Sequence, residues 1–205
     1  GRYNVTATVG AFTGTFDLSN TSPGTPTNVV ATAQTSTSVL IVWSGPVVGA
    51  TYEVQRLASG NVSSTVGSST SGSLTDSAAT ANTAYLYEVR EISPAVSTYG
   101  TADLATTVIF TDPSLPLGNL AAGIELKPSH FTQLRTAVEA VRALAGLGGG
   151  SYSDPTLTGG TTTVKRAHLT ELRAALDEAR TALLLPYDTY ARPDIVANTT
   201  SISAG

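Results

Sequence analysis

Hydrophobic and polar residues alternate in short runs along the first half of the chain, a pattern typical of half-buried β-strands. The first two runs lie within residues 1–22 and are separated by Gly10. Their apolar positions are Tyr3, Val5, Val9, Phe12, Phe16 and Leu18. An isolated two-stranded hairpin is marginal in water, so we expect this segment to pack on another sheet.

The amino-acid sequences of these two runs also resemble those of a known family. Residues 3–9 read YNVTATV and residues 15–20 read TFDLSN. These segments resemble the closing hairpin of a bacterial immunoglobulin-like domain, whose other strands do not occur in this chain. We therefore interpret residues 1–22 as a partial immunoglobulin-like β-hairpin whose strands can be donated to a neighbouring sheet.

Residues 23–110 form a second segment, which begins with a linker containing Pro23 and Pro26. Short apolar runs then predict strands near residues 29–31, 39–43, 51–56, 85–90 and 104–110, and a turn at 74–76 precedes the fourth of them. Strands of this length between Gly/Ser turns are typical of an all-β sandwich. The residues expected in its core are Trp43, Tyr52, Val54, Tyr85, Tyr87 and Val89.

This segment resembles a fibronectin type III domain over nearly all its length. The resemblance is carried by Pro26, Trp43, TYEVQR at 51–56, LTD at 74–76, AYLYEVR at 84–90 and Tyr99-Gly100. It implies that Trp43 is the core tryptophan and that Tyr85 is a corner tyrosine whose hydroxyl bonds nearby backbone. The cell-attachment motif Arg-Gly-Asp of that family does not occur here, so its function cannot be carried over.

From residue 111 to 205 the pattern changes to a repeat with an offset of 38 residues. Residues 126–135 (LKPSHFTQLR) match residues 164–173 (VKRAHLTELR). The matched positions include His130 and His168, Leu134 and Leu172, and Arg135 and Arg173. Apolar residues at three- and four-residue spacing predict one amphipathic helix in each copy, and the two helices are expected to form a hairpin.

Within the first helix, we expect Phe131, Leu134 and Val138 on the buried stripe, and Arg135 and Arg142 on the solvent face. The repeat is similar to those that follow fibronectin-like domains in bacterial exported proteins, a similarity that carries no activity with it. A β-prone tail containing Ile195 and Ile202 follows the second helix. The predicted fold class is therefore multidomain β plus α.

Composition narrows the range of functions. Charged residues make up only 13% of the chain and the net charge is −4, which gives no basic surface for nucleic acid. There is no cysteine, and no apolar run approaches the roughly 20 residues of a membrane span. The chain also lacks methionine, so we expect it to be processed or cut from a longer protein. We predict an extracellular or cell-surface location.

Candidate chemistry is sparse. His130 and His168 share one repeat position and lack metal-ligand spacing, so a helix-capping role is expected. Gln133 and Glu171 are expected on solvated helix faces. No catalytic residue, cofactor or metal site is predicted. Four sequons permit glycan attachment, beginning at Asn4, Asn20, Asn61 and Asn198.

Two functional hypotheses follow. The first is a non-catalytic extracellular structural protein, a self-assembling filament or surface-layer subunit in which β-strand complementation makes a head-to-tail homopolymer. Its candidate assembly strands are the N-terminal hairpin and the tail with Ile195 and Ile202. The alternative is a binding or spacer module of a larger secreted enzyme or adhesin. An enzyme in its own right is disfavoured because clustered acids and cysteine are missing.

Overall fold

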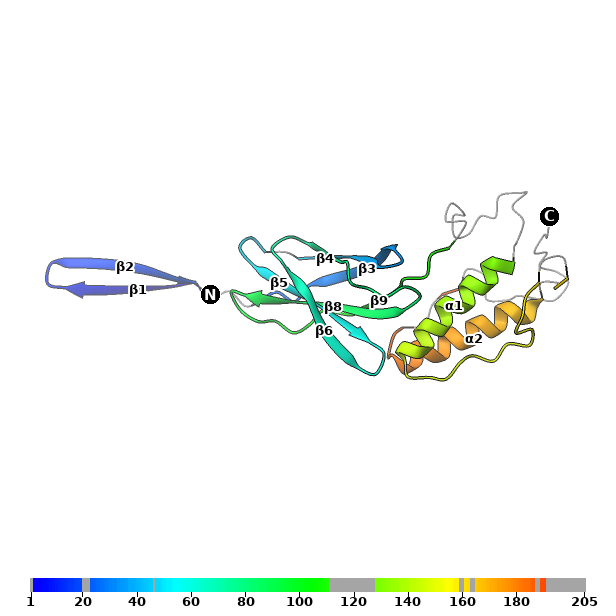
Figure 1. Cartoon of the computed structure of the whole chain (residues 1–205). Coiled ribbons are helices and arrows are strands. Elements are labelled where there is room, and N and C mark those ends of the chain that lie inside the picture. Colours follow the sequence, from blue (N-terminus) through cyan, green and yellow to red (C-terminus); the bar gives the residue numbers. More distant parts are fainter. Residues whose placement is uncertain are drawn as a thin grey trace.

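The computed structural model of the chain describes residues 2–19, 23–45, 47–110, 128–158, 161–162, 165–186 and 189–190. In this part the chain forms strands β1 to β9 followed by helices α1 and α2. Figure 1 shows three parts in a row, with the hairpin β1–β2 at one end, the sandwich in the middle and the helix pair at the other end. The predicted combination of a β-sandwich with helices is confirmed.

The hairpin consists of β1 (Arg2–Val9) and β2 (Phe12–Ser19). The strands pair antiparallel without interruption, from Arg2 opposite Ser19 to Val9 opposite Phe12. The two-residue loop has Gly10 at φ 63°, and Gly in the first central position is typical of a type II′ turn. The hairpin projects away from the other labelled strands and helices (Figure 1), and Phe12 at its tip is 84% exposed.

Two antiparallel sheets form the sandwich. The three-stranded sheet has the order β3 (Thr27–Thr35), β4 (Ser38–Ser44), β7 (Ser73–Asp76). The four-stranded sheet has the order β6 (Val62–Ser69), β5 (Thr51–Ala58), β8 (Ala84–Ser93), β9 (Asp103–Thr106). Alternate residues of β4, β5 and β8 point inward, because side chains along a strand alternate between its two faces.

The core lies between these sheets. Trp43, Tyr52, Val54, Tyr85, Tyr87 and Val89 are all at most 5% exposed. The rings of Trp43 and Tyr52 lie 5.9 Å apart and are tilted by 56°, a usual geometry for packed aromatics. At the edge of the core, a side chain at Gly100 would collide with the carbonyl oxygen of Pro26, which explains the need for glycine there.

Strand β6 was not expected from the sequence, because its residues, VSSTVGSS, show little apolar alternation. In the structure Val62–Ser69 pairs with β5 from Ala58 opposite Val62 to Tyr52 opposite Ser69. Pairing with a strong neighbouring strand satisfies the backbone groups and overrides the weak β-propensity of serine and glycine. Strand β9 is also shorter than the predicted run and ends at Thr106.

Helices α1 (Pro128–Leu144) and α2 (Arg166–Ala182) pack on each other through Phe131, Val138, Leu172 and Ala175. They also pack on the sandwich. Ala84 of β8 shares a buried cluster with Val141, Leu144 and Ala179 of the helices. The Ser59 hydroxyl donates a hydrogen bond of 2.7 Å to the carbonyl oxygen of Ala143. The sandwich and the helix pair are therefore joined by a continuous apolar contact.

The buried face of α1 differs from the predicted one. Leu134 is 39% exposed, whereas Arg135 and Arg142 are only 8% and 7% exposed. Phe131, Arg135, Val138 and Arg142 recur at helical spacing and form the inward row. The prediction of a solvated arginine face was wrong because the loop after α1 covers these side chains and accepts their hydrogen bonds.

The two helices end in the same way. Gly146 has φ 72°, and the N–H of Leu147 donates to the Arg142 carbonyl at 2.9 Å. At the matching position of the second copy, Leu184 has φ 57°, and the N–H of Leu185 donates to the Arg180 carbonyl at 2.9 Å. Both are Schellman-type ends with a left-handed residue, but only the first copy has the glycine that this conformation favours.

We expect Leu184→Gly to raise the free energy of unfolding by about 1 kcal/mol, because a left-handed residue with a Cβ is strained by roughly that amount. Leu184 is 92% exposed, so little packing is lost. Urea unfolding measures the change. Leu184→Ala is the control, since it shortens the side chain but keeps the Cβ, and a glycine variant no more stable than the alanine variant would contradict the prediction.

Candidate functional site

The most buried charged group in the sandwich is Asp76, at the end of β7, which is 2% exposed. Its Oδ2 accepts hydrogen bonds from Arg56 Nη1 at 2.8 Å and from the Tyr87 hydroxyl at 2.9 Å. Its Oδ1 accepts one from the N–H of Ala78 at 2.9 Å. Burial, and next the hydrogen bond to Asp76, raise the pKa of Tyr87. Both carboxylate oxygens are thus used within the fold, so the cluster is structural.

Two tyrosine hydroxyls anchor loops of the sandwich. The N–H of Thr80 donates to the Tyr85 hydroxyl at 3.0 Å, which is the contact of a tyrosine corner. The Tyr52 hydroxyl accepts from the N–H of Val47 at 2.9 Å and donates to the carbonyl of Gly45 at 3.2 Å. Neither ring forms an exposed platform for a sugar or a base, since both are buried.

The helical repeat contains a brace made of an arginine, a tyrosine and an acid. In the first copy the Arg135 guanidinium lies 4.5 Å from the Tyr152 ring centroid, and the Tyr152 hydroxyl donates to Glu139 Oε1 at 2.6 Å. In the second copy Arg173 lies 4.5 Å from the Tyr190 ring centroid. There the Tyr190 hydroxyl donates to Asp177 Oδ1 at 2.8 Å.

Each brace ties the segment after a helix back onto that same helix. The stacked cation and the hydroxyl bond both restrain the tyrosine, and cation–π contacts of this kind stabilise by about 0.5–2 kcal/mol. Burial, and next the bond to Glu139, raise the pKa of Tyr152, so its hydroxyl remains a donor. The sequence offered a signal for this brace, because all three positions recur at the 38-residue offset, but the interpretation of the arginines as solvated obscured it.

His168 is fully buried at the start of α2 and was the strongest candidate for chemistry. Its Nδ1 accepts from the N–H of Lys165 at 3.3 Å, and its Nε2 lies 2.8 Å from Asp154 Oδ2. Because a backbone N–H can only donate, the neutral ring carries its proton on Nε2 and donates it to Asp154. Both ring nitrogens are therefore occupied, which leaves none to take a proton from a substrate.

Asp154 links this histidine to the preceding loop. The Lys165 ammonium also donates to Asp154 Oδ2, at 2.7 Å. Hydrogen bonds from Lys165 and then from His168 lower the pKa of the Asp154 carboxyl. His130 occupies the matching position in α1, but the residues that precede Pro128 lie outside the described ranges. At His168 the predicted capping role corresponds to the hydrogen bond that its Nδ1 accepts from the N–H of Lys165.

Glu171 is not on a solvated face as the sequence suggested. Its Oε1 accepts hydrogen bonds from the backbone N–H of Ser153, at 3.1 Å, and from the Ser153 hydroxyl. Its Oε2 is buried. The prediction failed because it treated α2 as a free amphipathic helix, whereas the loop after α1 folds over this side.

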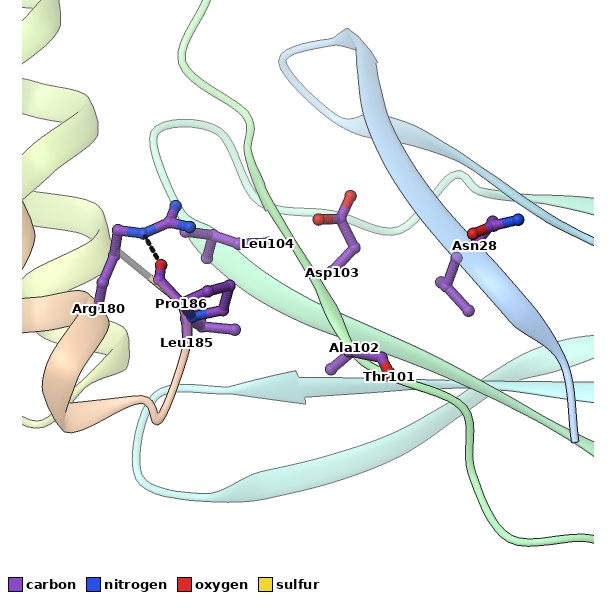
Figure 2. Close-up of a pocket in the computed structure, with 9 residues that line it drawn as sticks. Asn28, Thr101, Ala102, Asp103, Leu104, Arg180, Leu185 and Pro186 are labelled. Atoms are coloured by element: carbon purple, nitrogen blue, oxygen red, sulfur yellow. Dashed lines mark hydrogen bonds between the residues drawn. The ribbon is translucent and has the colours of Figure 1, made fainter. Parts of the chain in front are cut away.

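A pocket of about 410 Å³ lies where the end of α2 meets β3 and the β9 edge (Figure 2). Its charged side chains already have backbone partners. The Asp103 carboxylate accepts from the N–H of Ala31 at 2.8 Å, and Arg180 Nε donates to the Pro186 carbonyl at 2.9 Å. The pocket is therefore best described as part of the contact region between the sandwich and the helices.

No group of three or more His, Cys, Asp or Glu residues is arranged to hold a metal ion within the described ranges. In that same part of the chain, neither helix is long and apolar enough to cross a membrane. Of the four sequon asparagines, Asn61 is exposed in the turn before β6 and Asn4 lies in β1. Asn20 and Asn198 lie outside the described residues.

The candidate assembly residues are only partly placed. Tyr3, Val5 and Val9 lie in β1, and Phe12, Phe16 and Leu18 lie in β2. Ile195 and Ile202 lie outside the described residues, so the predicted role of the tail has no structural test.

The strand orders β3-β4-β7 and β6-β5-β8-β9 define a fibronectin type III-like sandwich with a docked helix pair. No protein-family model matches the chain, and a comparison with curated proteins found no match. Among solved structures, an Fn3-like protein from Clostridium thermocellum is similar, with 23% sequence identity and a TM-score of 0.37. The match covers 41% of this chain and 92% of the Clostridium chain.

Two further structures are similar in the same region. One is the fibronectin type III domain of human fibronectin type III domain containing protein 3, with 20% sequence identity and a TM-score of 0.39. The match covers 48% of this chain and 98% of the human domain. The other is the FN5 domain of Drosophila Lar, with 20% sequence identity and a TM-score of 0.37. The match covers 41% of this chain and 95% of the Lar domain.

Proposed function

We propose that this protein is a non-catalytic structural module of an extracellular or cell-surface assembly, which joins a second copy of itself by adding the hairpin β1–β2 to a sheet. The observation that carries the proposal is the position of this hairpin. Among the residues that the structure describes, it pairs only with itself, over eight residues per strand, and it projects from the sandwich (Figure 1). A two-stranded hairpin needs a further strand or a packed face to be stable.

The hairpin offers backbone groups for such a pairing. The two-residue loop makes Val9 and Phe12 a hydrogen-bonded pair, and the pairs alternate along the ladder. Thr6 and Thr15 are consequently a non-hydrogen-bonded pair, so their N–H and C=O groups point away from the partner strand. Both residues are exposed. Open groups of this kind are what β-strand addition uses.

The arrangement along the molecule favours a head-to-tail contact. The helix pair is joined to the sandwich by a buried cluster, so these two parts act as one body. The hairpin extends from the opposite end (Figure 1). A contact between two different surfaces generates a filament when its rotation does not close into a ring.

Composition supports the proposed location and the burial of the hairpin. Residues 2–19 contain only two charged residues, Arg2 and Asp17, so little charge has to be desolvated when the hairpin is covered. The low charge of the whole chain and the exposed sequon at Asn61 are compatible with a protein displayed outside the cell.

The test is the dependence of mass on concentration, measured by sedimentation equilibrium. We expect the unaltered chain to associate and the double variant Thr6→Pro/Thr15→Pro to lose that association. Proline removes the outward N–H of each edge but leaves the bonds within the hairpin. Thr6→Val/Thr15→Val is the matched control and should associate as before. A monomer at all concentrations would overturn the proposal.

A second function, that of a spacer module in a larger secreted protein, is favoured by the cluster that joins Ala84 to Val141 and Leu144. This contact makes the sandwich and helices one elongated body suited to holding other parts apart. A strictly monomeric chain in the experiment above would favour this spacer role.

A further inference from the structure

We infer that the acceptor of the hairpin is the outer edge of β6 in a second copy of the chain. This inference rests on the proposed function and names the surface that completes it. It starts from the four sheet edges of the sandwich, which belong to β3 and β7 in one sheet and to β6 and β9 in the other.

Three of these edges are poor acceptors. Strands β7 and β9 are only four residues long. Strand β3 is longer, but the N–H of Ala31 already donates to the Asp103 carboxylate of β9 at 2.8 Å. Short strands and side chains that cover an edge are common ways in which proteins prevent strand addition.

Strand β6 lacks most of these protections. It has eight residues, the same number as β1 and as β2. Its sequence VSSTVGSS contains no charge and no proline, which are the residues that usually block an edge. In the described part of the chain, the backbone of Val62–Ser69 has hydrogen bonds to β5 and to no other element.

One irregularity limits where the new strand can pair. The register between β5 and β6 shifts between Val54 and Gln55, opposite Gly67 and Thr65. This bulge bends β6, but residues 62–65 pair regularly with β5. We therefore assign the first half of β6 as the segment where pairing with the hairpin begins.

The β6 edge and the hairpin β1–β2 also carry similar side chains. Ser63 and Thr65 are exposed on β6, and Thr6 and Thr15 are exposed on the hairpin. Hydroxyl side chains opposite one another on paired strands form hydrogen bonds that stabilise the pairing. No like charges meet between β6 and the hairpin, because the only charges of the hairpin are Arg2 and Asp17 near its base.

The chain has no cysteine, so single cysteines can report the contact. Chains carrying Thr6→Cys or Thr15→Cys are mixed with chains carrying Ser63→Cys or Thr65→Cys and oxidised mildly. We expect disulfide-linked heterodimers to form at least tenfold faster than with Val42→Cys. Val42 is the matched control because it is 37% exposed but lies on β4, whose two edges are both paired.

A second measurement uses lysine, which protects strand edges in natural sheets. Ser63→Lys should abolish the association seen by sedimentation, whereas Val42→Lys should preserve it. If the unaltered chain associates, the proline variant does not, and yet β6 cysteines cross-link no faster than the control, the acceptor inference is wrong and the proposed function stands. If the unaltered chain stays monomeric, both fail.

Discussion

Replacing Asp76 with alanine will lower the free energy of unfolding by about 3–5 kcal/mol, because removing one partner of a buried ion pair leaves the other charge uncompensated. Asp76 is 2% exposed and receives hydrogen bonds from Arg56 and Tyr87. In the variant, the buried Tyr87 hydroxyl loses its acceptor, and the Arg56 guanidinium loses its carboxylate partner while keeping the Ala78 carbonyl at 3.1 Å. Urea unfolding followed by the fluorescence of Trp43, the single tryptophan, measures the change.

Tyr87→Phe is the control for this experiment. It removes one hydroxyl but keeps the ion pair between Arg56 and Asp76, so we expect a loss of only about 1 kcal/mol. Equal losses for the two variants would mean that the ion pair contributes nothing beyond the hydroxyl bond, which would contradict the structural role assigned to Asp76.

Replacing Phe131 with alanine will lower the free energy of unfolding of the helix pair by about 3–5 kcal/mol, the usual loss for a buried phenylalanine. Phe131 is 3% exposed and packs against Val138 and Leu172. Its ring also contacts that of His168 edge-on, with centroids 5.9 Å apart. Circular dichroism at a helical wavelength follows the transition.

The matched control is Leu134→Ala, one turn further along the same helix. Leu134 is 39% exposed, so we expect a loss of about 1 kcal/mol or less. The pair of variants decides between two faces of α1. Similar losses would support the stripe predicted from apolar spacing, and a large difference would support the inward row seen in the structure.

The sandwich could be predicted largely from the sequence. Alternation in β4, β5 and β8 identified the inward residues, because one face of each strand must leave water. The Trp43 and Tyr85 environments followed from the resemblance to a fibronectin type III domain. Strand β6 could not be predicted, since VSSTVGSS has little apolar patterning and becomes a strand only by pairing with β5.

The helical repeat, like the sandwich, could be predicted from the sequence only in part. The 38-residue offset and the apolar spacing predicted two helices, and Gly146 indicated where the first one ends. Helical spacing alone could not reveal that Arg135 and Arg142 are buried. Their partners include the carbonyls of Asp154, Gly148 and Ala175, which are brought near only by the loop and by α2.

The sequence by itself determined most of the local elements: alternation specified β4, β5 and β8, three- and four-residue spacing specified the two helices, and a glycine specified the end of the first helix. These features depend on residues a few positions apart, so the chain carries them directly. The tertiary structure alone decided that Arg135 stacks on Tyr152, that β6 is an edge, and that the helices dock on Ala84. Such contacts join residues far apart in the chain, and their free energy arises only when packing excludes water from both partners.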